Sequence, residues 1–427
     1  MLTINSARQQ KYCDGVSRRG FLRIGALGIG SMTFADLLRA EDAAGVGSSH
    51  KAVINIHLGG GPSHQDMFDL KPNAPVEFRG EFNPIQTNVP GFEICEHYPK
   101  LAQMADKFAV IRSLVGSNAG HSNFQTLTGY NQRSMTNIGG RPAMGSVTGK
   151  LLGATPSGAP PYVSYSGGSP GYLGPIYKPF SPNDARNVLR LNRGITAERL
   201  GDRTNLLSSL DTIRRDIDAS GQLDALDSYT QRAYDMVLSG EVADALDLKK
   251  EDPEIVSIYG KTSANLLYAR RLIQAGVRVV SMSAGWGGWD THSNNFKSLG
   301  TRNLPQMDNG LSALIEDLEG LDMLNDVTIV VWGEFGRTPR VNSKAGRDHW
   351  PKLSTAFLAG GGMKTGQAVG VSTKYAEYAK DRPVDYQEVH ATLYHNLGID
   401  TVSTTITDPN GRPQFLLDMR EPIAELI

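Results

Sequence analysis

The stretch VTIVVWGEFGRTPRVNSKAGRDHWP, residues 327–351, joins an apolar run to a polar, glycine-containing loop. The run 327–332 has the length and the β-branched content of a buried strand, and it stops at Gly333. Ligands of an open α/β sheet bind beyond the carboxyl ends of its strands. The residues after this strand include groups that can hold a metal and an oxyanion: Glu334, Arg337, Arg347, Asp348 and His349. The alternative is an ordinary loop with solvated charges.

Short apolar runs recur along the chain, and most of them end at glycine-rich loops. We expect strands at 51–58, 108–114, 162–165, 277–283 and 354–358. We expect helices at 98–106, 141–152, within 206–275, at 304–318 and at 384–397. This mixture indicates an α/β protein. Residues 166–202 lack a sustained period and are expected to form a loop or lid over the site, or a decorative insertion.

The first expected strand runs into Gly59-Gly60-Gly61-Pro62-Ser63, which would let backbone N–H groups approach a ligand closely. Asp66 follows and is read equally well as a metal ligand or as a turn or cap residue, whereas Asp69 is expected to be structural. The loop is not a Walker P-loop, because no Gly-Lys-Ser/Thr follows. A serine hydrolase built on Ser63 is a weaker alternative, because the Gly-x-Ser-x-Gly elbow is missing.

The second loop, residues 116–123, is a glycine turn that leads into a helical run ending near Thr128. A helix N-terminus of this kind favours anions. Ser117, His121 and Ser122 are expected near that positive end. His121 is a candidate ligand or base, and the alternative is a hydrogen-bonded capping residue.

The third loop, residues 284–292, reads AGWGGWDTH and follows a strong strand. A carboxylate and an imidazole two residues apart suit Zn, Mn or Fe, so Asp290 and His292 are candidate ligands. Trp286 and Trp289 are expected to wall the pocket. Two later histidines, His390 and His395, are five residues apart and lack the i, i+4 spacing of a helical metal pair, so we expect them to be structural.

Composition excludes several classes of protein. The 427 residues carry a formal net charge of −1 and no long basic run, which argues against a nucleic-acid partner. Cys13 and Cys95 are the only cysteines, and Cys13 lies in an expected leader, so no intramolecular disulfide is expected in the mature chain.

The N-terminus reads as an export signal. Residues 17–22, SRRGFL, form a twin-arginine motif, and a modest apolar stretch follows at 24–38. That stretch is too short for a spanning helix. We therefore expect a twin-arginine signal peptide at 1–40, recognition by the twin-arginine export machinery, no stable membrane span after its removal, and a periplasmic or extracellular protein. A surface helix with an arginine pair is the alternative.

The motifs together resemble a known superfamily. Gly-Gly-Pro-Ser with Asp66, Gly-Trp-Asp-Thr-His, Gly-Glu-Phe-Gly-Arg-Thr-Pro and Gly-Arg-Asp-His-Trp are similar to an exported, functionally uncharacterised branch of the alkaline phosphatase and sulfatase superfamily, known as a domain of unknown function. The resemblance implies a single α/β domain over 51–427, with a doubly wound, mostly parallel central sheet, helices on both faces and an insertion around 166–260. It also implies hydrolysis of sulfate or phosphate esters with a divalent metal such as Zn, Ca, Mn or Fe.

The resemblance also assigns residues. Asp290 and His292 match an Asp and a His that share one metal, Glu334 matches the acid of an Asp-His pair, His349 matches the last His ligand, and Asp66 matches the acid after the first strand. Two departures stand out. Phe335 replaces the His of the Asp-His pair to which Glu334 belongs, and the nucleophile slot falls near Ala119 and Gly120, which cannot attack.

The sequence therefore predicts an exported, metal-dependent hydrolase of a small-molecule or glycan anionic ester. The expected metal ligands are Asp66, Asp290, His292, Glu334, Asp348 and His349. The expected catalytic groups are Ser122, His121, Arg337 and Arg347. Ser122 would be the nucleophile unless water attacks directly, and an arginine would stabilise the oxyanion. The alternative is a non-catalytic binding protein that holds an anionic glycan or a partner protein in the same cleft.

Overall fold

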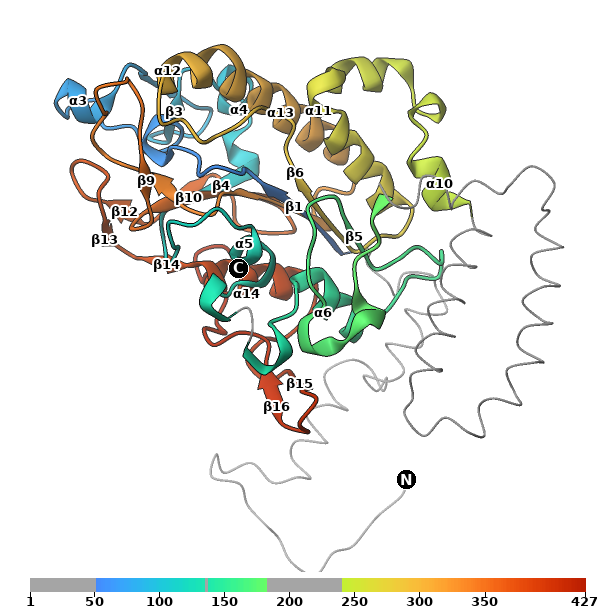
Figure 1. The fold of residues 1–427 in the computed structure, drawn as a ribbon. Coiled ribbons are helices and arrows are strands. Elements are labelled where there is room, and N and C mark those ends of the chain that lie inside the picture. Colours follow the sequence, from blue (N-terminus) through green and yellow to red (C-terminus); the bar gives the residue numbers. More distant parts are fainter. Residues whose placement is uncertain (1–50, 135–136, 183–239) are drawn as a thin grey trace, which may run out of the picture. The chain divides into compact units, whose positions relative to one another are not determined.

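An eight-stranded sheet forms the centre of the computed structural model, which describes residues 51–134, 137–182 and 240–427. The strand order is β11-β4-β10-β7-β1-β6-β5, and β14 pairs with β4 beside this path (Figure 1). The strands are β1 (Ala52–His57), β4 (Phe108–Val115), β5 (Tyr162–Ser164), β6 (Val279–Ser283), β7 (Val327–Trp332), β10 (Ser354–Gly360), β11 (Gln367–Val369) and β14 (Val384–Asp385). The six strands expected from the sequence are all present.

Strand direction places the polar loops at one edge. Strands β7, β1, β6 and β5 are mutually parallel. β10 is antiparallel to both β7 and β4, so β4 runs in the same direction as β7. β11 and β14 are parallel to β4, which leaves β10 as the one reversed strand of the described sheet. In the register, His57 lies opposite both Ser283 and Trp332, so the exits of β1, β6 and β7 are level.

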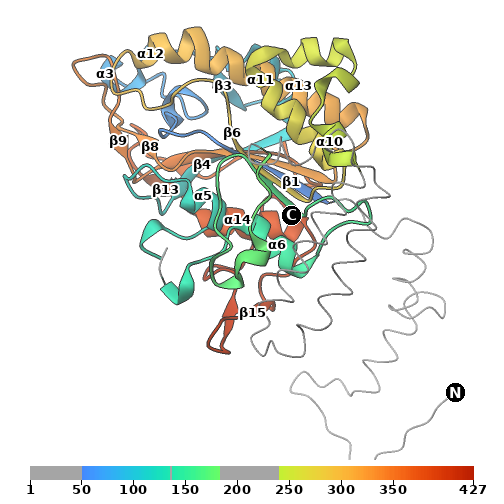
Figure 2. The ribbon, with the colours of Figure 1, turned by 45° about the vertical axis from the view of Figure 1, so that its right-hand side comes forward.

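Helices cover both faces of the sheet, as Figures 1 and 2 show. On one face α11 (Pro253–Gln274) and α13 (Leu304–Gly320) pack over β1, whose Ile54 and Ile56 belong to the same apolar cluster as Leu311 and Leu314. On the other face lie α5 (Phe124–Thr128), α6 (Met144–Leu151) and α14 (Tyr386–Asn396), and Val53 packs there. Successive side chains of a strand point to opposite faces, so β1 supplies both cores.

Several expected helices differ in detail. Helix α14 begins at Tyr386 rather than at 384, because Asp385 accepts from Gln387 N and forms a capping box with Glu388. The helix expected at 98–106 divides into α4 (Pro99–Ala102) and the 3-10 turn η2 (Ala105–Lys107). The helical stretch expected within 206–275 is described from residue 240 onward, as α10 (Glu241–Ala245) and α11, and its earlier part lies outside the described residues.

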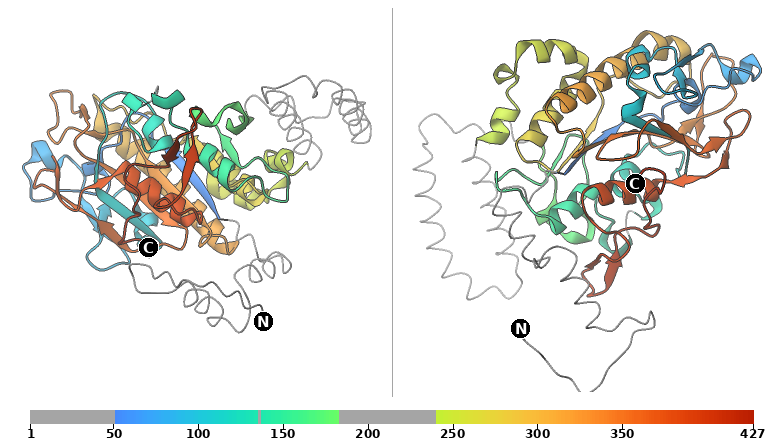
Figure 3. Two further views of the ribbon diagram at one scale, coloured as in Figure 1. Left: turned by 90° about the horizontal axis from the view of Figure 1, so that it is seen from below. Right: turned by 180° about the vertical axis from the view of Figure 1, so that it is seen from behind.

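Smaller elements decorate the sheet, and Figure 3 shows them from two further sides. The short strand pairs are β2 (Pro84–Gln86) with β3 (Glu93–Cys95), β8 (Gly336–Arg337) with β9 (His349–Trp350), β12 (Val371–Ser372) with β13 (Ala379–Asp381), and β15 (Thr405–Thr407) with β16 (Pro413–Phe415). The other helical segments are α3 (Val76–Arg79), α12 (Asn295–Ser298), the π-helix η8 (Leu299–Asn303) and the 3-10 turns η1 (His64–Asp66), η3 (Gln132–Ser134), η4 (Asn137–Gly139), η5 (Gly171–Leu173), η6 (Pro175–Tyr177) and η7 (Leu248–Lys250).

Two further sequence predictions fall on parts of the chain that the structure does not describe. The twin-arginine motif at 17–22 and the whole signal region 1–40 lie outside the described residues, as does the part of the expected lid from 183 to 202. Across the described ranges, no helix combines the length and the apolar character needed to cross a membrane.

Candidate metal centre

The loops after β1, β4, β6 and β7 bring acidic and imidazole side chains together at the carboxyl edge of the sheet. Their close approach depends on glycine at position 60. Gly60 has φ +113°, and a Cβ there would collide with the backbone nitrogen of Asp290. Gly61 is equally restricted, because a Cβ would enter the ring of Phe335. The β1 loop therefore packs directly under the two loops that carry Asp290 and Glu334.

Asp290, His292 and His349 form the tightest group, which we call the metal centre. Asp290 Oδ1 lies 3.0 Å from His292 Nε2 and 3.2 Å from His349 Nε2, and the two Nε2 atoms are 3.1 Å apart. Ligands of a tetrahedral Zn²⁺ at 2.0–2.1 Å from the ion are roughly 3.3 Å from one another. The three atoms thus have nearly the mutual spacing of ligands of one ion.

The other ring nitrogens explain why a cation fits here. His292 Nδ1 donates to Asp348 Oδ1 over 2.6 Å, and His349 Nδ1 donates to the Ala119 carbonyl over 3.0 Å. A neutral imidazole that donates through Nδ1 has its lone pair on Nε2. Two such lone pairs and a carboxylate oxygen then face one point, an arrangement that a shared cation stabilises.

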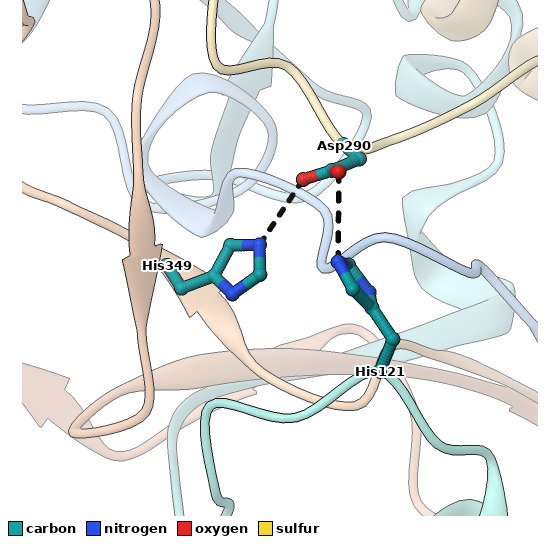
Figure 4. A group of neighbouring side chains, drawn as sticks. All are labelled: His121, Asp290 and His349. Atoms are coloured by element: carbon teal, nitrogen blue, oxygen red, sulfur yellow. Dashed lines mark hydrogen bonds and ion pairs between the residues drawn. The ribbon is translucent and has the colours of Figure 1, made fainter.

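His121 approaches the other oxygen of the same carboxylate, and Figure 4 shows Asp290 joined to both the His121 and the His349 imidazole. His121 Nε2 lies 3.5 Å from Asp290 Oδ2. The ligand atoms of His121, Asp290 and His349 all lie within 4.8 Å of one another. The described residues thus include a group with the spacing to hold a metal ion, and His121, a candidate ligand or base in the sequence, lies in it.

Hydrogen bonds from surrounding residues hold Asp290 and His292 in place. Burial raises the pKa of Asp290, but the hydrogen bond from Arg337 and the proximity of the His349 and His292 rings outweigh it and leave the pKa below its usual value. The hydrogen bond from His292 lowers the pKa of Asp348. Asp348, expected as a ligand, instead contacts the far side of the His292 ring, which is the position of an outer carboxylate that orients a metal-bound histidine.

Glu334 and His57 form a second group beside the first. Glu334 Oε1 accepts from Gly60 N at 2.8 Å and from His121 Nδ1 at 2.9 Å. Glu334 Oε2 is buried without a hydrogen-bond partner among the described residues, and the residue is only 3% exposed. His57 Nε2 lies 3.5 Å from this oxygen, too far for a good hydrogen bond but suitable for two ligands of one ion. Glu334 therefore has one oxygen free for a cation.

Burial lowers the pKa of His57 despite the nearby Glu334 carboxylate, so the ring favours the neutral form that can ligate a metal. His57 Nδ1 lies 3.1 Å from the hydroxyl of Thr126. These groups border an open cleft of about 530 Å³, which is lined by His57, Gly59, Gly60, His121, Ser122, Asn123, Asp290 and Glu334.

Three residues expected in the site are committed to other contacts. Asp66 is fully buried, and its carboxylate accepts from Arg347 at 2.8 and 2.9 Å, from Asn295 at 2.8 Å and from Ser63 at 2.6 Å. Three of these bonds end on Oδ2 and one on Oδ1, so Asp66 is paired with Arg347 in a buried network and does not line the cleft. Arg347 is likewise fully buried against Asp66. Arg337 is buried and donates to Gly60 O, Gly61 O, Arg347 O and Asp290, so it supports the loops and holds Asp290.

The structure places the expected nucleophile, Ser122, at the cleft together with His121. Ser122 borders the cleft, and its hydroxyl accepts from Phe124 N at 3.2 Å. Ser117 instead donates to the Pro351 carbonyl at 2.9 Å. The expectation that tryptophans wall the pocket is wrong, because Trp286 and Trp289 are buried in the apolar core and Trp286 donates to Ser263. His390 is buried on α14, where its ring bonds to the Gln125 carbonyl, and His395 lies further along the same helix.

Comparison with known protein families gives a match over most of the chain. The model of the family described as "Protein of unknown function (DUF1501)" matches residues 50–427. The chain belongs to the DUF1501 family. Curated proteins give no match. Among solved structures, the chain is similar to one titled "Crystal structure of Ps i-CgsB", with 8% identity, a TM-score of 0.40, and coverage of 82% of this chain and 72% of that one.

In this DUF1501 chain the site contains one residue that the sequence analysis missed. His57 is the last residue of β1, within the apolar run 51–58, and it was read as part of the strand. Glu334 and Asp290 were found because polar groups at the carboxyl ends of strands are candidate site residues. The same criterion would have identified His57.

Proposed function

We propose that this protein is an exported, metal-dependent hydrolase of sulfate or phosphate esters with an alkaline phosphatase-like, doubly wound fold. The observation that carries the proposal is the triangle of Asp290 Oδ1, His292 Nε2 and His349 Nε2, with sides of 3.0–3.2 Å, at the carboxyl edge of the sheet. The adjoining open cleft supports a substrate that enters from solvent.

The ligand atoms of the site favour a transition metal over calcium. Imidazole nitrogens with carboxylate oxygens suit Zn, Mn or Fe, whereas Ca²⁺ prefers a shell of oxygens. Among these residues, Asp290, His292, His349 and His121 would hold one ion, and Glu334 Oε2 with His57 Nε2 offers a second place. A bound ion would polarise the ester oxygen and lower the pKa of a water molecule.

The chain's own groups have distinct tasks in this proposal. Asp348, Arg337 and Glu334 fix the orientations of His292, Asp290 and His121 through the contacts described above. Ser122 is the side chain with a hydroxyl in the cleft lining, and it is the candidate to attack the ester. If water attacks instead, replacement of Ser122 by Ala will leave the rate nearly unchanged.

The test combines metal analysis with ester assays. The purified full chain is expected to contain a divalent transition metal and to hydrolyse an aryl phosphate, an aryl sulfate or an aryl phosphodiester. His349→Ala should lose both the metal and the activity, whereas His395→Ala on α14, outside the cleft, should keep both. Metal-loaded protein that hydrolyses none of the three ester classes would contradict the proposal.

Export is tested separately. The twin-arginine motif at residues 17–22 supports passage in the folded state, which suits a protein that acquires its metal before it crosses the membrane. Replacement of Arg18 and Arg19 by Lys together should retain the protein in the cytoplasm, as measured by fractionation. A double variant that still reaches the periplasm would contradict this part of the proposal.

One observation favours a second candidate, a binding protein for an anionic glycan or a partner protein. Phe335 occupies the place where the superfamily has a metal-binding His, and its ring packs against His349 with centroids 4.3 Å apart. Retention of a sulfated polysaccharide by metal-free protein, together with no ester hydrolysis, would decide for this candidate.

A further inference from the structure

Asp66 links three of the loops that meet at the cleft. Its carboxylate accepts from Ser63 of the β1 loop, from Asn295 after the β6 loop and from Arg347 of the β7 loop, all over 2.6–2.9 Å. All four side chains are at most 1% exposed. In a buried setting these charge-assisted bonds are strong and have little freedom to rearrange.

The residues bound by Asp66 are close in sequence to two ligands of the metal centre. Asn295 follows His292 by three positions, and Arg347 precedes His349 by two. The two loops are also joined through their backbones, because Arg347 N donates to Thr291 O at 3.0 Å and Asn295 N donates to Ala345 O at 2.8 Å. The separation of His292 from His349 thus depends on the geometry of both loops around Asp66.

The third ligand is connected to the same pair. Arg337 donates to the Arg347 carbonyl at 2.8 Å, and another nitrogen of its guanidinium donates to Asp290 Oδ1. A continuous line of contacts therefore runs from Asp66 through the buried Arg347 and Arg337 to Asp290, whose side chain is 42% exposed. Both arginines are fully buried, so water does not compete for the hydrogen bonds of their guanidinium groups.

We infer that Asp66 is a positioning residue for the metal centre: it ligates no ion, and it sets the spacing of Asp290, His292 and His349. The inference rests on the metal site of the proposed function, but not on the ester substrate. An outer contact that orients metal ligands typically changes metal affinity or activity by 10–100-fold when it is removed. We expect about a tenfold or greater loss of metal affinity on removal of the Asp66 charge.

The experiment compares two buried Arg–Asp pairs in the full chain. Asp66→Asn keeps the side-chain volume and removes the charge. Asp317→Asn does the same in a pair between α11 and α13, where Asp317 bonds to Arg270 at 2.8 Å with both side chains at most 9% exposed. Zn²⁺ affinity is measured by competition with a chelator, and the ligand geometry by the visible spectrum of the Co²⁺-loaded protein. Thermal unfolding of the metal-free proteins reports stability.

The expected result is that both variants lose thermal stability, while only Asp66→Asn loses Zn²⁺ affinity and alters the Co²⁺ spectrum. Equal Zn²⁺ affinities and unchanged spectra in the two variants would overturn the inference. Asn295→Ala is the second variant if Asp66→Asn does not fold, because it removes one of the four bonds. Wild-type affinity in Asn295→Ala would also overturn the inference.

The outcomes separate the two proposals. A wild-type chain that binds Zn²⁺ and shows the expected difference between the variants, but hydrolyses no ester, contradicts the hydrolase proposal and leaves the positioning role intact. A wild-type chain that hydrolyses esters, with Asp66→Asn as good a Zn²⁺ binder as Asp317→Asn, contradicts the positioning role alone.

Discussion

Asp348 Oδ1 lies 2.6 Å from His292 Nδ1, so the imidazole is held with its Nε2 atom toward Asp290. Replacement of Asp348 by Ala should lower Zn²⁺ affinity by roughly 10–100-fold, because the ring loses the acceptor that fixes its tautomer and orientation. Chelator competition measures the loss. Asp326→Ala is the control, since Asp326 pairs with Lys51 at 3.3 Å and is more than a third exposed. Equal Zn²⁺ affinity in the two variants would rule out an orienting role for Asp348.

Glu334→Gln should keep the fold and weaken the site. The amide oxygen can still accept from Gly60 N and His121 Nδ1, while the buried oxygen near His57 becomes an uncharged amide nitrogen. We expect metal affinity or ester hydrolysis to fall by roughly 10–100-fold with little change in thermal stability. Glu319→Gln, at an exposed pair with Lys107, is the control. Unchanged activity and metal content in Glu334→Gln would show that the free oxygen has no functional role.

Gly60→Ala should destabilise the protein and displace Asp290. The new Cβ meets the backbone nitrogen of Asp290, and φ at this position is +113°, so roughly 1–3 kcal/mol of stability should be lost. Gly59→Ala is the matched control, because a Cβ there meets only the His57 ring, at 3.6 Å. Thermal unfolding and metal content distinguish the two variants. Similar behaviour of both would mean that the two loops can separate without cost.

Stability should fall as the pH drops from about 6.5 to about 4, partly because of His390. Burial lowers the pKa of His390 to about 4, while the unfolded chain keeps the ordinary value of 6.5. Between these values the unfolded state binds the extra proton, so the stabilisation is complete above pH 6.5 and is lost on acidification. The loss is on the order of 3 kcal/mol below pH 4.

His390→Gln tests this dependence, because glutamine can still donate to the Gln125 carbonyl but does not titrate. Denaturant unfolding at several pH values should give a shallower slope for His390→Gln between pH 4 and 6.5. The exposed His395 on the same helix is the control position, and His395→Gln should keep the wild-type slope. A His390→Gln slope as steep as that of the wild type would assign the acid sensitivity to other groups, such as the buried His64, whose pKa is also lowered to about 4.

The sequence predicted the sheet well because its central strands are continuous apolar runs. β7 has the expected bounds, 327–332, and the loops after β1, β4, β6 and β7 meet at the expected edge. The position of β10 between β7 and β4, running in the opposite direction, could not be predicted, because a fully buried run has the same pattern in either direction.

The site was predicted less completely, for a physical reason. Sequence patterns identify which carboxylates follow strands, but they do not show whether an arginine elsewhere in the chain neutralises one of them. Asp66 and Arg347 are 281 positions apart, and only the fold shows that they bind each other. His57 shows the opposite error, a site residue that was missed. It lies inside the apolar run 51–58, and that run was read as strand without regard to its polar residue.

The reversed direction of β10 has a consequence for biosynthesis. Because β10 runs against its neighbours, His349 lies just before this strand, on a segment that approaches the carboxyl edge rather than leaving it. During synthesis Asp290 and His292 therefore emerge 57 or more residues before His349, the third corner of the triangle, and His349 is fixed at the edge only once β10 pairs with β4 and β7. Under the proposed function, an ion would bind this triangle only after nearly the whole sheet has assembled.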